Sequence, residues 1–172
     1  STQEAQTKVS LQIAQQVKKA LMENIVENAV NFPSIDPSIL KEIQPYITLA
    51  EKLGSFQAQM VDGNIERLHI TLGGEISDYQ TQPFTLSLLK GLLEPTVTGA
   101  VNYVNSRYIA EERGIKIVET KSRDVQDFAN LIHLEVETTK EKSSVAGTLF
   151  SKKEPRIVRI NGYHVDASPE GY

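Results

Sequence analysis

The chain has 172 residues, is 40% hydrophobic and 23% charged, carries a formal net charge of −4 and contains no cysteine. This composition is typical of a globular domain with one full-sized core, and it excludes a collagen-like or disordered chain, disulfides, thiolate metal sites and a cysteine nucleophile. The lack of a long apolar run or a signal-peptide pattern, together with the acidic balance, predicts a cytoplasmic protein that binds neither membrane nor nucleic acid.

A first helix is predicted over residues 2–22. Ser1 and Glu4 have capping-box spacing, and apolar side chains recur every four residues, at Val9, Ile13, Val17 and Leu21. The following residues lose this periodicity and end in Asn31-Phe32-Pro33-Ser34. A connection is therefore expected over 23–34, with a domain boundary between residues 27 and 28.

Two further helices are predicted before the first strand. Asp36-Pro37 is typical of an N-cap followed by a proline in the first turn, and Pro45 repeats this start signal. We therefore expect a short helix followed by a longer one over 45–60. The longer helix carries an apolar stripe interrupted by Gly54, which indicates close packing against a neighbouring element.

The central part of the chain predicts one strand and two helices. Apolar and polar residues alternate just before Gly73-Gly74, which indicates a half-buried strand that buries Leu68, Ile70 and Leu72. The near-helical spacing of leucines predicts a helix over 82–94, and a further helix is expected over 106–113. A proline or a glycine directly follows each of these two segments.

From residue 115 onward the hydrophobic period changes to two. Four strands are predicted in succession, on the alternating apolar residues of 115–117, 132–136, 145–149 and 158–160. Because short turns separate them, antiparallel neighbours are expected. Since helices lie mostly in the first 113 residues and strands mostly after them, the sequence predicts an α+β fold with helices packed on a mostly antiparallel sheet.

No known catalytic motif occurs in the chain. It lacks the glycine-rich turns of nucleotide-binding folds, as well as Gly-x-Ser-x-Gly and His-Glu-x-x-His. The three histidines, His69, His133 and His164, fall on expected strands, so a metal site would need three strands to converge. We expect His69 and His133 on the polar side of their strands instead. No catalytic residue, metal or cofactor is therefore assigned to this chain.

Basic residues near the end of the chain are the remaining chemical signal. Between residues 151 and 160, Glu154 is accompanied by four cations: Lys152, Lys153, Arg156 and Arg159. The two lysines are typical of a solvated turn. If 156–161 is one strand, Arg156 shares a face with Val158 and Ile160 while Arg159 lies on the other face, so one arginine emerges beside apolar side chains. Such a guanidinium binds either an internal carboxylate or an external phosphate.

Several uncommon strings occur in the order in which one family carries them. They are Ser1–Gln6, Asn28–Pro33, Pro45–Gly54, Val101–Asn105, Val145–Phe150 and Arg156–Gly162. On these strings the chain resembles, along essentially its whole length, the long form of D-3-phosphoglycerate dehydrogenase of L-serine biosynthesis. In that family a nicotinamide-binding catalytic unit precedes an intervening, or allosteric substrate-binding, domain, and a serine-binding ACT domain follows it.

The resemblance implies a division of the chain and a set of partners. Residues 1–27 would be the terminal helix of the upstream catalytic unit with a linker, and 28–172 the intervening regulatory domain. NAD and the catalytic residues would belong to the upstream unit, and the serine site to the downstream ACT domain. The family also implies a homo-oligomer, and a small phosphorylated acid or phosphate as effector.

The resemblance further indicates which residues would hold the effector anion. Arg156 lies where family members carry a basic residue for that anion, whereas Tyr163 and Ser168 occupy positions where a strongly regulated member has arginines. Arg159, Lys121 and Arg107 are candidates on charge alone. The sequence thus favours an anion-binding regulatory domain, and the alternative is a structural spacer and oligomerisation module without a ligand.

Overall fold

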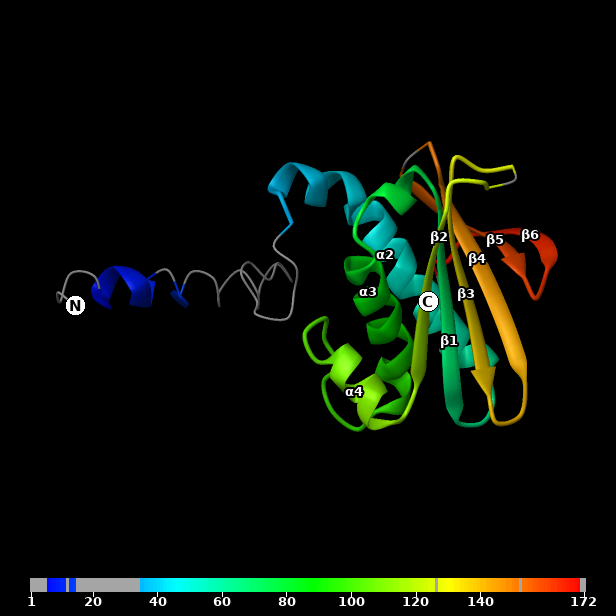
Figure 1. Cartoon of the computed structure of the whole chain (residues 1–172), viewed down its shortest axis with the longest axis horizontal. Coiled ribbons are helices and arrows are strands. Elements are labelled where there is room, and N and C mark those ends of the chain that lie inside the picture. Colours follow the sequence, from blue (N-terminus) through cyan, green and yellow to red (C-terminus); the bar gives the residue numbers. More distant parts are fainter. Residues whose placement is uncertain (1–5, 12, 15–34, 126, 152, 171–172) are drawn as a thin grey trace. The chain divides into compact units, whose positions relative to one another are not determined.

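In the computed structural model, the residues described are 6–11, 13–14, 35–125, 127–151 and 153–170. The chain divides into two compact units, Ser1–Ile35 and Asp36–Tyr172. In the first unit residues 6–11 and 13–14 are helical, as the predicted first helix requires, and Val9 and Ile13 are exposed. The rest of that helix, the connection over 23–34 and the boundary at residue 27 lie outside the described residues. Figure 1 shows the elements of the second unit.

Helix α2 (Pro37–Met60) is one continuous helix, where the sequence predicted two. Asp36 caps it as expected, because its carboxylate accepts a hydrogen bond of 2.8 Å from the backbone N–H two residues later. Pro45 lies inside the helix, and Figure 1 shows α2 changing direction along its length. Ile43 and Ile47 on either side of the proline are both buried, so packing maintains the helix across a residue that bends it.

The other helices agree with the prediction to within one residue at their ends. They are α3 (Gln82–Leu93) and α4 (Ser106–Glu112), and two short 3-10 helices, η1 (Glu75–Asp78) and η2 (Glu94–Thr96), accompany them. Within the described ranges, no helix has both the length and the apolar content that crossing a membrane requires.

Helices α2 and α3 touch through two glycines. A Cβ added to Gly54 would lie 2.2 Å from the backbone oxygen of Leu88, and one added to Gly91 would lie 2.0 Å from the backbone oxygen of Glu51. Real Cβ atoms do not approach backbone that closely, so any larger residue would push the helices apart. The close packing predicted at Gly54 is therefore confirmed.

A six-stranded sheet has the order β2-β1-β3-β4-β5-β6. Its strands are β1 (Ile65–Gly74), β2 (Lys116–Ser122), β3 (Asn130–Thr138), β4 (Lys142–Phe150), β5 (Glu154–Ile160) and β6 (Tyr163–Ala167). All neighbouring pairs are antiparallel except β1 and β2. The predicted α+β fold, with helices on a mostly antiparallel sheet, is confirmed.

Strand β2 corrects one part of the predicted topology. It lies at the edge of the sheet, parallel to β1, and not antiparallel to the next strand in sequence. The prediction assumed that successive strands are neighbours. Between β1 and β2, however, α3 and α4 carry the chain back along the sheet, so both strands start at the same end.

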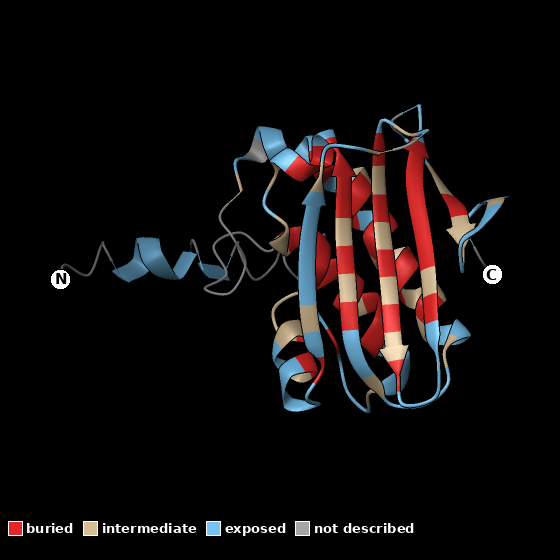
Figure 2. Cartoon of the chain, turned by 45° about the vertical axis from the view of Figure 1, so that its right-hand side comes forward, coloured by how far each residue is buried: buried red, intermediate tan, exposed pale blue. Residues whose placement is uncertain are grey.

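The helices lie on one side of the sheet, as Figure 2 shows. Alternate residues of β3, including Ile132, Leu134 and Val136, are fully buried on this side. A Cβ on Gly147 of β4 would lie 3.0 Å from the side chains of Leu49 and Leu53, so α2 packs directly on that strand. These contacts form the core of the second unit.

The opposite side of the sheet is covered by no described helix, and we call it the open face (Figure 2). Register partners share a face, which assigns a polar set of side chains to it. Apart from Val118 and Ala146 they are polar: Lys116, Val118 and Thr120 of β2, Arg67, His69 and Thr71 of β1, His133, Glu135 and Glu137 of β3, and Lys142, Ser144, Ala146 and Thr148 of β4.

Candidate anion-binding site

The two arginines of β5 lie on the same face of the sheet, whereas regular alternation predicted opposite faces for Arg156 and Arg159. Arg159 pairs with Ala146, but the next residue of β4 pairs with Ile157, so β5 contains one extra residue at this point. This is a β-bulge, which shifts the alternation by one. Arg159 therefore shares the open face with Ala146, and Arg156 shares it with Thr148.

The bulge also accounts for the burial pattern of β5. Ile157 and Val158 are consecutive, yet they are 2% and 3% exposed. In a bulge two residues of one strand oppose a single residue of its neighbour, so both can turn toward the core. The expected pairing of Arg156 with the face of Val158 is wrong for the same reason.

Both guanidinium groups have only distant carboxylates around them. Nε of Arg156 is 3.8 Å from Oδ1 of Asp166, and its Nη2 is 3.8 Å from Oε2 of Glu154. Nη2 of Arg159 is 3.7 Å from Oδ2 of Asp127. These distances allow an ion pair but are too long for a hydrogen bond. Among the described residues, the buried Nε atoms of both arginines have no hydrogen-bond partner.

The arginines are anchored more firmly than their carboxylate partners. The side chains of Arg156 and Arg159 are 33% and 28% exposed, whereas those of Glu154, Asp127 and Asp166 are 68 to 70% exposed. Water screens such exposed carboxylates, so these pairs stabilise the fold little and separate easily. Because these two side chains are still about a third exposed, an external anion can reach the exposed part of each guanidinium group and replace the distant carboxylates.

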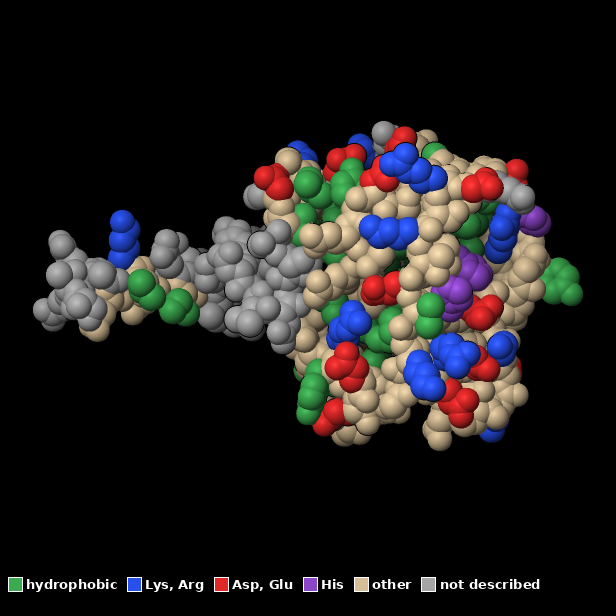
Figure 3. All heavy atoms as spheres, viewed as in Figure 1, with side chains coloured by type: hydrophobic (Ala, Val, Ile, Leu, Met, Phe, Trp, Pro, Cys, Tyr) green, Lys and Arg blue, Asp and Glu red, His purple; other side chains and the backbone are tan. Residues whose placement is uncertain are grey.

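Histidines lie on the same face as the arginines. His133 is in line with Ala146 and Arg159 across β3, β4 and β5, and Arg159 pairs with His164 of β6. Nε2 of His69 lies 2.8 Å from Oγ1 of Thr120. The predicted polar side for His69 and His133 is confirmed. Figure 3 shows histidine side chains among basic and acidic ones on the sheet surface.

The electrostatics of His133 follow from this position. Burial lowers the pKa of His133 below its usual value of 6.5, because a charged imidazole would lose hydration there. The Glu135 carboxylate opposes this effect on the pKa, while the positive charges of His69 and Arg159 add to it. An anion bound at Arg159 would offset that positive charge and raise the pKa of His133.

The other two basic candidates lie away from this cluster. Nζ of Lys121 donates to the backbone oxygen of Tyr79 at 2.6 Å. Nε of Arg107 lies 3.3 Å from Oε1 of Glu111, and its Nη1 is 3.8 Å from Oε1 of Glu119. Lys121 pairs with a core residue of β1, so it points toward the helices. Three strands separate β2 from β5, which is about 19 Å at about 4.8 Å per strand.

Tyr163 and Ser168, where the resemblance implies arginines in strongly regulated members, add no charge to this face. Tyr163 pairs with Ile160 and is 77% exposed. Ser168 follows β6 and accepts a long contact of 3.4 Å from the backbone N–H of Glu170.

The structure also contains a polar pocket that the sequence did not predict. It is a pocket of about 500 Å³ at the end of the sheet where β1 and β2 begin, and its charged lining residues are Glu66, Arg67, Arg113, Lys116 and Glu137. These residues come from separate segments with no shared motif, so nothing in the sequence signals the pocket. In the described part of the chain no group of three or more His, Asp or Glu side chains is arranged to hold a metal ion.

Comparison with known proteins identifies the family of the chain. The family model of the D-3-phosphoglycerate dehydrogenase intervening domain matches residues 42–161. Proteins named D-3-phosphoglycerate dehydrogenase from Synechocystis sp. and Archaeoglobus fulgidus are 36% and 37% identical over the whole chain, which covers 31% and 32% of their length. The protein of that name from Methanocaldococcus jannaschii is 36% identical over 99% of the chain, which covers 32% of its length.

The chain thus spans about a third of the length of the relatives it matches. The matched region begins inside α2 and ends after β5, so it includes every helix and strand of the second unit except β6 and the first turns of α2. Both the family model and the relatives agree with the resemblance seen in the sequence. The chain therefore belongs to the D-3-phosphoglycerate dehydrogenase intervening domain family.

Proposed function

We propose that the chain is a regulatory domain that binds a small phosphorylated hydroxy acid, or phosphate itself, at Arg156 and Arg159 on the open face. One observation carries this proposal. The two guanidinium groups share a face through the bulge of β5, and their buried Nε atoms have no hydrogen-bond partner among the described residues. Arginine forks bind phosphate and carboxylate oxygens bidentately, so a doubly charged acid matches both side chains.

The test measures the melting temperature of the 172-residue chain with and without millimolar 3-phosphoglycerate, with sodium chloride at matched ionic strength as the reference. A ligand that binds only the folded state raises the melting temperature, by a few degrees when its concentration is about a hundred times Kd. We expect this increase in the native chain and its loss in the variant Arg156→Gln/Arg159→Gln.

Arg123→Gln is the matched control for this experiment. Arg123 is 81% exposed and pairs with Asp78, which is also exposed, so its removal leaves the open-face arginines intact. The control should keep the full increase. An increase of the same size in the double variant, or none in the native chain, would refute the proposed site.

We infer further that the domain belongs to a longer cytoplasmic enzyme, an NAD-dependent D-3-phosphoglycerate dehydrogenase of L-serine biosynthesis. A catalytic domain that binds NAD would precede it, and an ACT domain would follow it. The names of the relatives and their greater length support this inference. Steady-state kinetics of that enzyme with Arg156→Gln/Arg159→Gln should show an altered response to added phosphate while activity at low substrate concentration is retained.

A second candidate function is a spacer that holds subunits together without a ligand. Strand β2 favours it, because β2 is a seven-residue edge strand whose outer side has no partner among the described strands. Pairing between two such edges would extend the sheet across a homo-oligomer. Sedimentation equilibrium tests this function. A stable oligomer whose mass does not change when phosphate compounds are added would favour the spacer over the regulatory domain.

A further inference from the structure

The pocket at the start of β1 and β2 is distinct from the proposed arginine site. Arg67 and Lys116 are register partners, so their side chains lie side by side on the open face, at the end where β1 and β2 begin. Arg113 and Gly114 come from the segment between α4 and β2, and they complete this wall of the pocket. Figure 3 shows lysine and arginine side chains gathered at this end of the sheet.

The cations around the pocket exceed the carboxylates available to them. Arg67 and Lys142 share one carboxylate, that of Glu137, at 3.4 Å each. Arg113 donates two hydrogen bonds of 3.1 Å to Thr96, but both acceptors are neutral oxygens, and no carboxylate of a described residue forms an ion pair with it.

Lys116 differs from the other cations of the pocket. Within the described ranges no hydrogen bond or ion pair is present at its ammonium group. Glu66 is the other carboxylate of the lining and forms no ion pair with a described residue. The pocket therefore combines positive charge with acceptor and donor groups that the chain leaves available.

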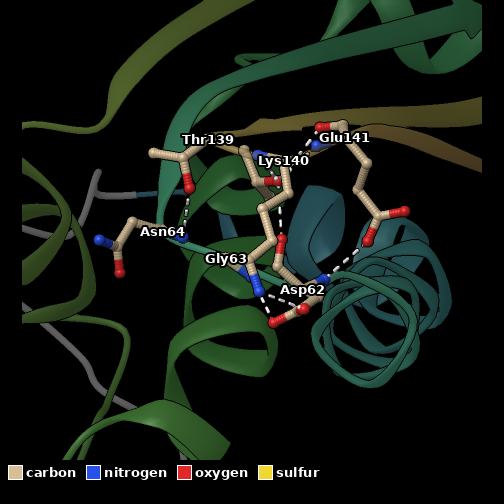
Figure 4. A network of polar contacts seen from close by, with 7 residues as sticks. Asp62, Gly63, Asn64, Thr139, Lys140 and Glu141 are labelled. Carbon is tan, nitrogen blue, oxygen red and sulfur yellow. Dashed lines mark hydrogen bonds and ion pairs between the residues drawn. The ribbon is translucent and has the colours of Figure 1, made fainter.

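The far wall of the pocket is held rigidly by contacts between two turns (Figure 4). The backbone N–H of Asn64 donates to Oγ1 of Thr139 at 3.2 Å, and the N–H of Thr139 donates to the backbone oxygen of Asn64 at 2.9 Å. The N–H of Asp62 donates to Oε1 of Glu141 at 2.7 Å, and Lys140 pairs with Asp62. A wall fixed before binding loses little conformational entropy when a ligand arrives.

We propose that this pocket is a second anion site, which takes a small organic dianion such as a phosphate monoester or a dicarboxylate. Lys116 and Arg113 hold its charged groups, and Arg67 contributes after releasing part of its contact with Glu137. The side-chain amide of Asn64 points away from the turn contacts in Figure 4 and is available to a hydroxyl group of the ligand. The pocket volume of about 500 Å³ is within the range typical of small-molecule sites.

The test is a titration of the ¹⁵N-labelled 172-residue chain, followed by amide chemical shifts, with inorganic phosphate, with malonate and with chloride at matched ionic strength. Two glycines report on the two sites separately. Gly114 lines the pocket, and Gly162 follows β5 in the turn beyond Arg159. We expect saturable shifts of Gly114 with phosphate or malonate, and none with chloride.

Charge-removing variants connect these shifts to the pocket. Lys116→Gln and Arg113→Gln should each raise the Kd measured from the Gly114 shift by about tenfold, since each removes a charge-assisted contact. Lys121→Gln is the matched control, because Lys121 is on the same strand but faces the helices. It should leave the Kd unchanged.

The outcomes separate the two sites. Three results would each overturn the pocket proposal. They are chemical-shift changes at Gly162 without any at Gly114, no change with either dianion, and a Kd that stays the same in Lys116→Gln. Shifts of Gly114 that survive Arg156→Gln/Arg159→Gln and need about tenfold more ligand in Lys116→Gln would establish it, whether or not Gly162 responds. A response to phosphate without malonate would restrict the ligand to phosphate esters, and the reverse would restrict it to dicarboxylates.

Discussion

Gln57 is a fully buried polar side chain whose hydrogen-bonding groups are unsatisfied. It lies on α2 one turn after Leu53, on the stripe that packs on β4, and it is 0% exposed. Neither its amide nitrogen nor its amide oxygen has a hydrogen-bond partner among the described residues. A buried amide without partners costs about 1–3 kcal/mol relative to its hydrated form.

Gln57→Met should therefore raise the free energy of unfolding by about 1–2 kcal/mol, because methionine fills a similar volume without polar atoms. Urea denaturation of the chain measures it. Gln59→Met is the control two residues further on, at an exposed position, and should change stability by less than about 0.5 kcal/mol. A loss of stability in Gln57→Met would show that the amide has an acceptor or a water in solution.

His133 makes stability depend on pH. Burial lowers its pKa in the folded chain below 6.5. When pH falls below the unfolded-state value, the unfolded chain binds a proton that the folded chain does not, so the free energy of unfolding declines until the folded pKa is reached. We expect stability to fall as the pH drops below about 6.5 through this group, and His133→Gln to flatten that part of the curve.

Urea denaturation at a series of pH values checks this prediction. His164→Gln is the comparison, since the side chain of His164 is exposed on β6 and its loss should leave the slope in place. A slope that persists in His133→Gln would assign it to other groups. Added phosphate should make the native decline smaller and end it at a higher pH, because an anion at Arg159 raises the folded pKa of His133 toward its unfolded value.

At the level of elements, a polar cluster supports the contact between α2 and α3. Oε1 of Glu51 lies 2.5 Å from Nζ of Lys90, and its Oε2 accepts a hydrogen bond of 2.5 Å from the Tyr103 hydroxyl. Nζ of Lys90 also lies 4.9 Å from the centre of the Tyr103 ring. Burial and the Glu51 carboxylate raise the pKa of Tyr103 far above its usual range. The tyrosine therefore stays a hydrogen-bond donor at all physiological pH values.

Glu51→Gln should lower the free energy of unfolding by about 2 kcal/mol, because it leaves Lys90 without its carboxylate where that lysine is only 14% exposed. Thermal or urea denaturation measures the change. Glu111→Gln is the matched control: its partner Arg107 is 41% exposed, and loss of such a surface pair costs less than about 0.5 kcal/mol. Equal effects of the two substitutions would contradict a special role for the cluster.

Single elements were also what the sequence predicted best. Apolar spacing identified α3, β1, β3 and β4, because the apolar residues of each are buried in the common core. Pro45 was misread as a helix start, since its effect depends on whether Ile43 and Ile47 find a core on both sides. That core is made by distant strands, which local spacing does not reveal.

At the scale of the whole molecule, the unpredicted features all involve pairing between distant segments. The parallel neighbour of β2 results from a crossover, and the common face of Arg156 and Arg159 results from their register with β4. The sequence indicated Arg156 as an anion ligand through a family resemblance. It could not indicate the alignment of His133 with Arg159, because only the strand order β3-β4-β5 creates it.

The sheet order also predicts how stability is distributed. Strands β3 and β4 are central and mostly buried, whereas β2 and β6 are edges with mostly exposed residues. We expect backbone amides of β3 and β4 to exchange with solvent deuterium at least about a hundredfold more slowly than those of β2 and β6. Slow exchange confined to the outer side of β2 would instead indicate that a second copy covers this edge.

The bulge of β5 has a consequence for how related sequences are compared. If a relative kept Arg156 and Arg159 three residues apart but paired this strand with β4 without the bulge, both arginines would still align with arginines, yet one of them would point into the helix side of the sheet. A deletion of one residue here would instead remove the bulge and leave both arginines on the open face, because residues two apart in a regular strand share a face. Whether two aligned arginines can meet the same anion depends on how their strand pairs with its neighbour as much as on their identity.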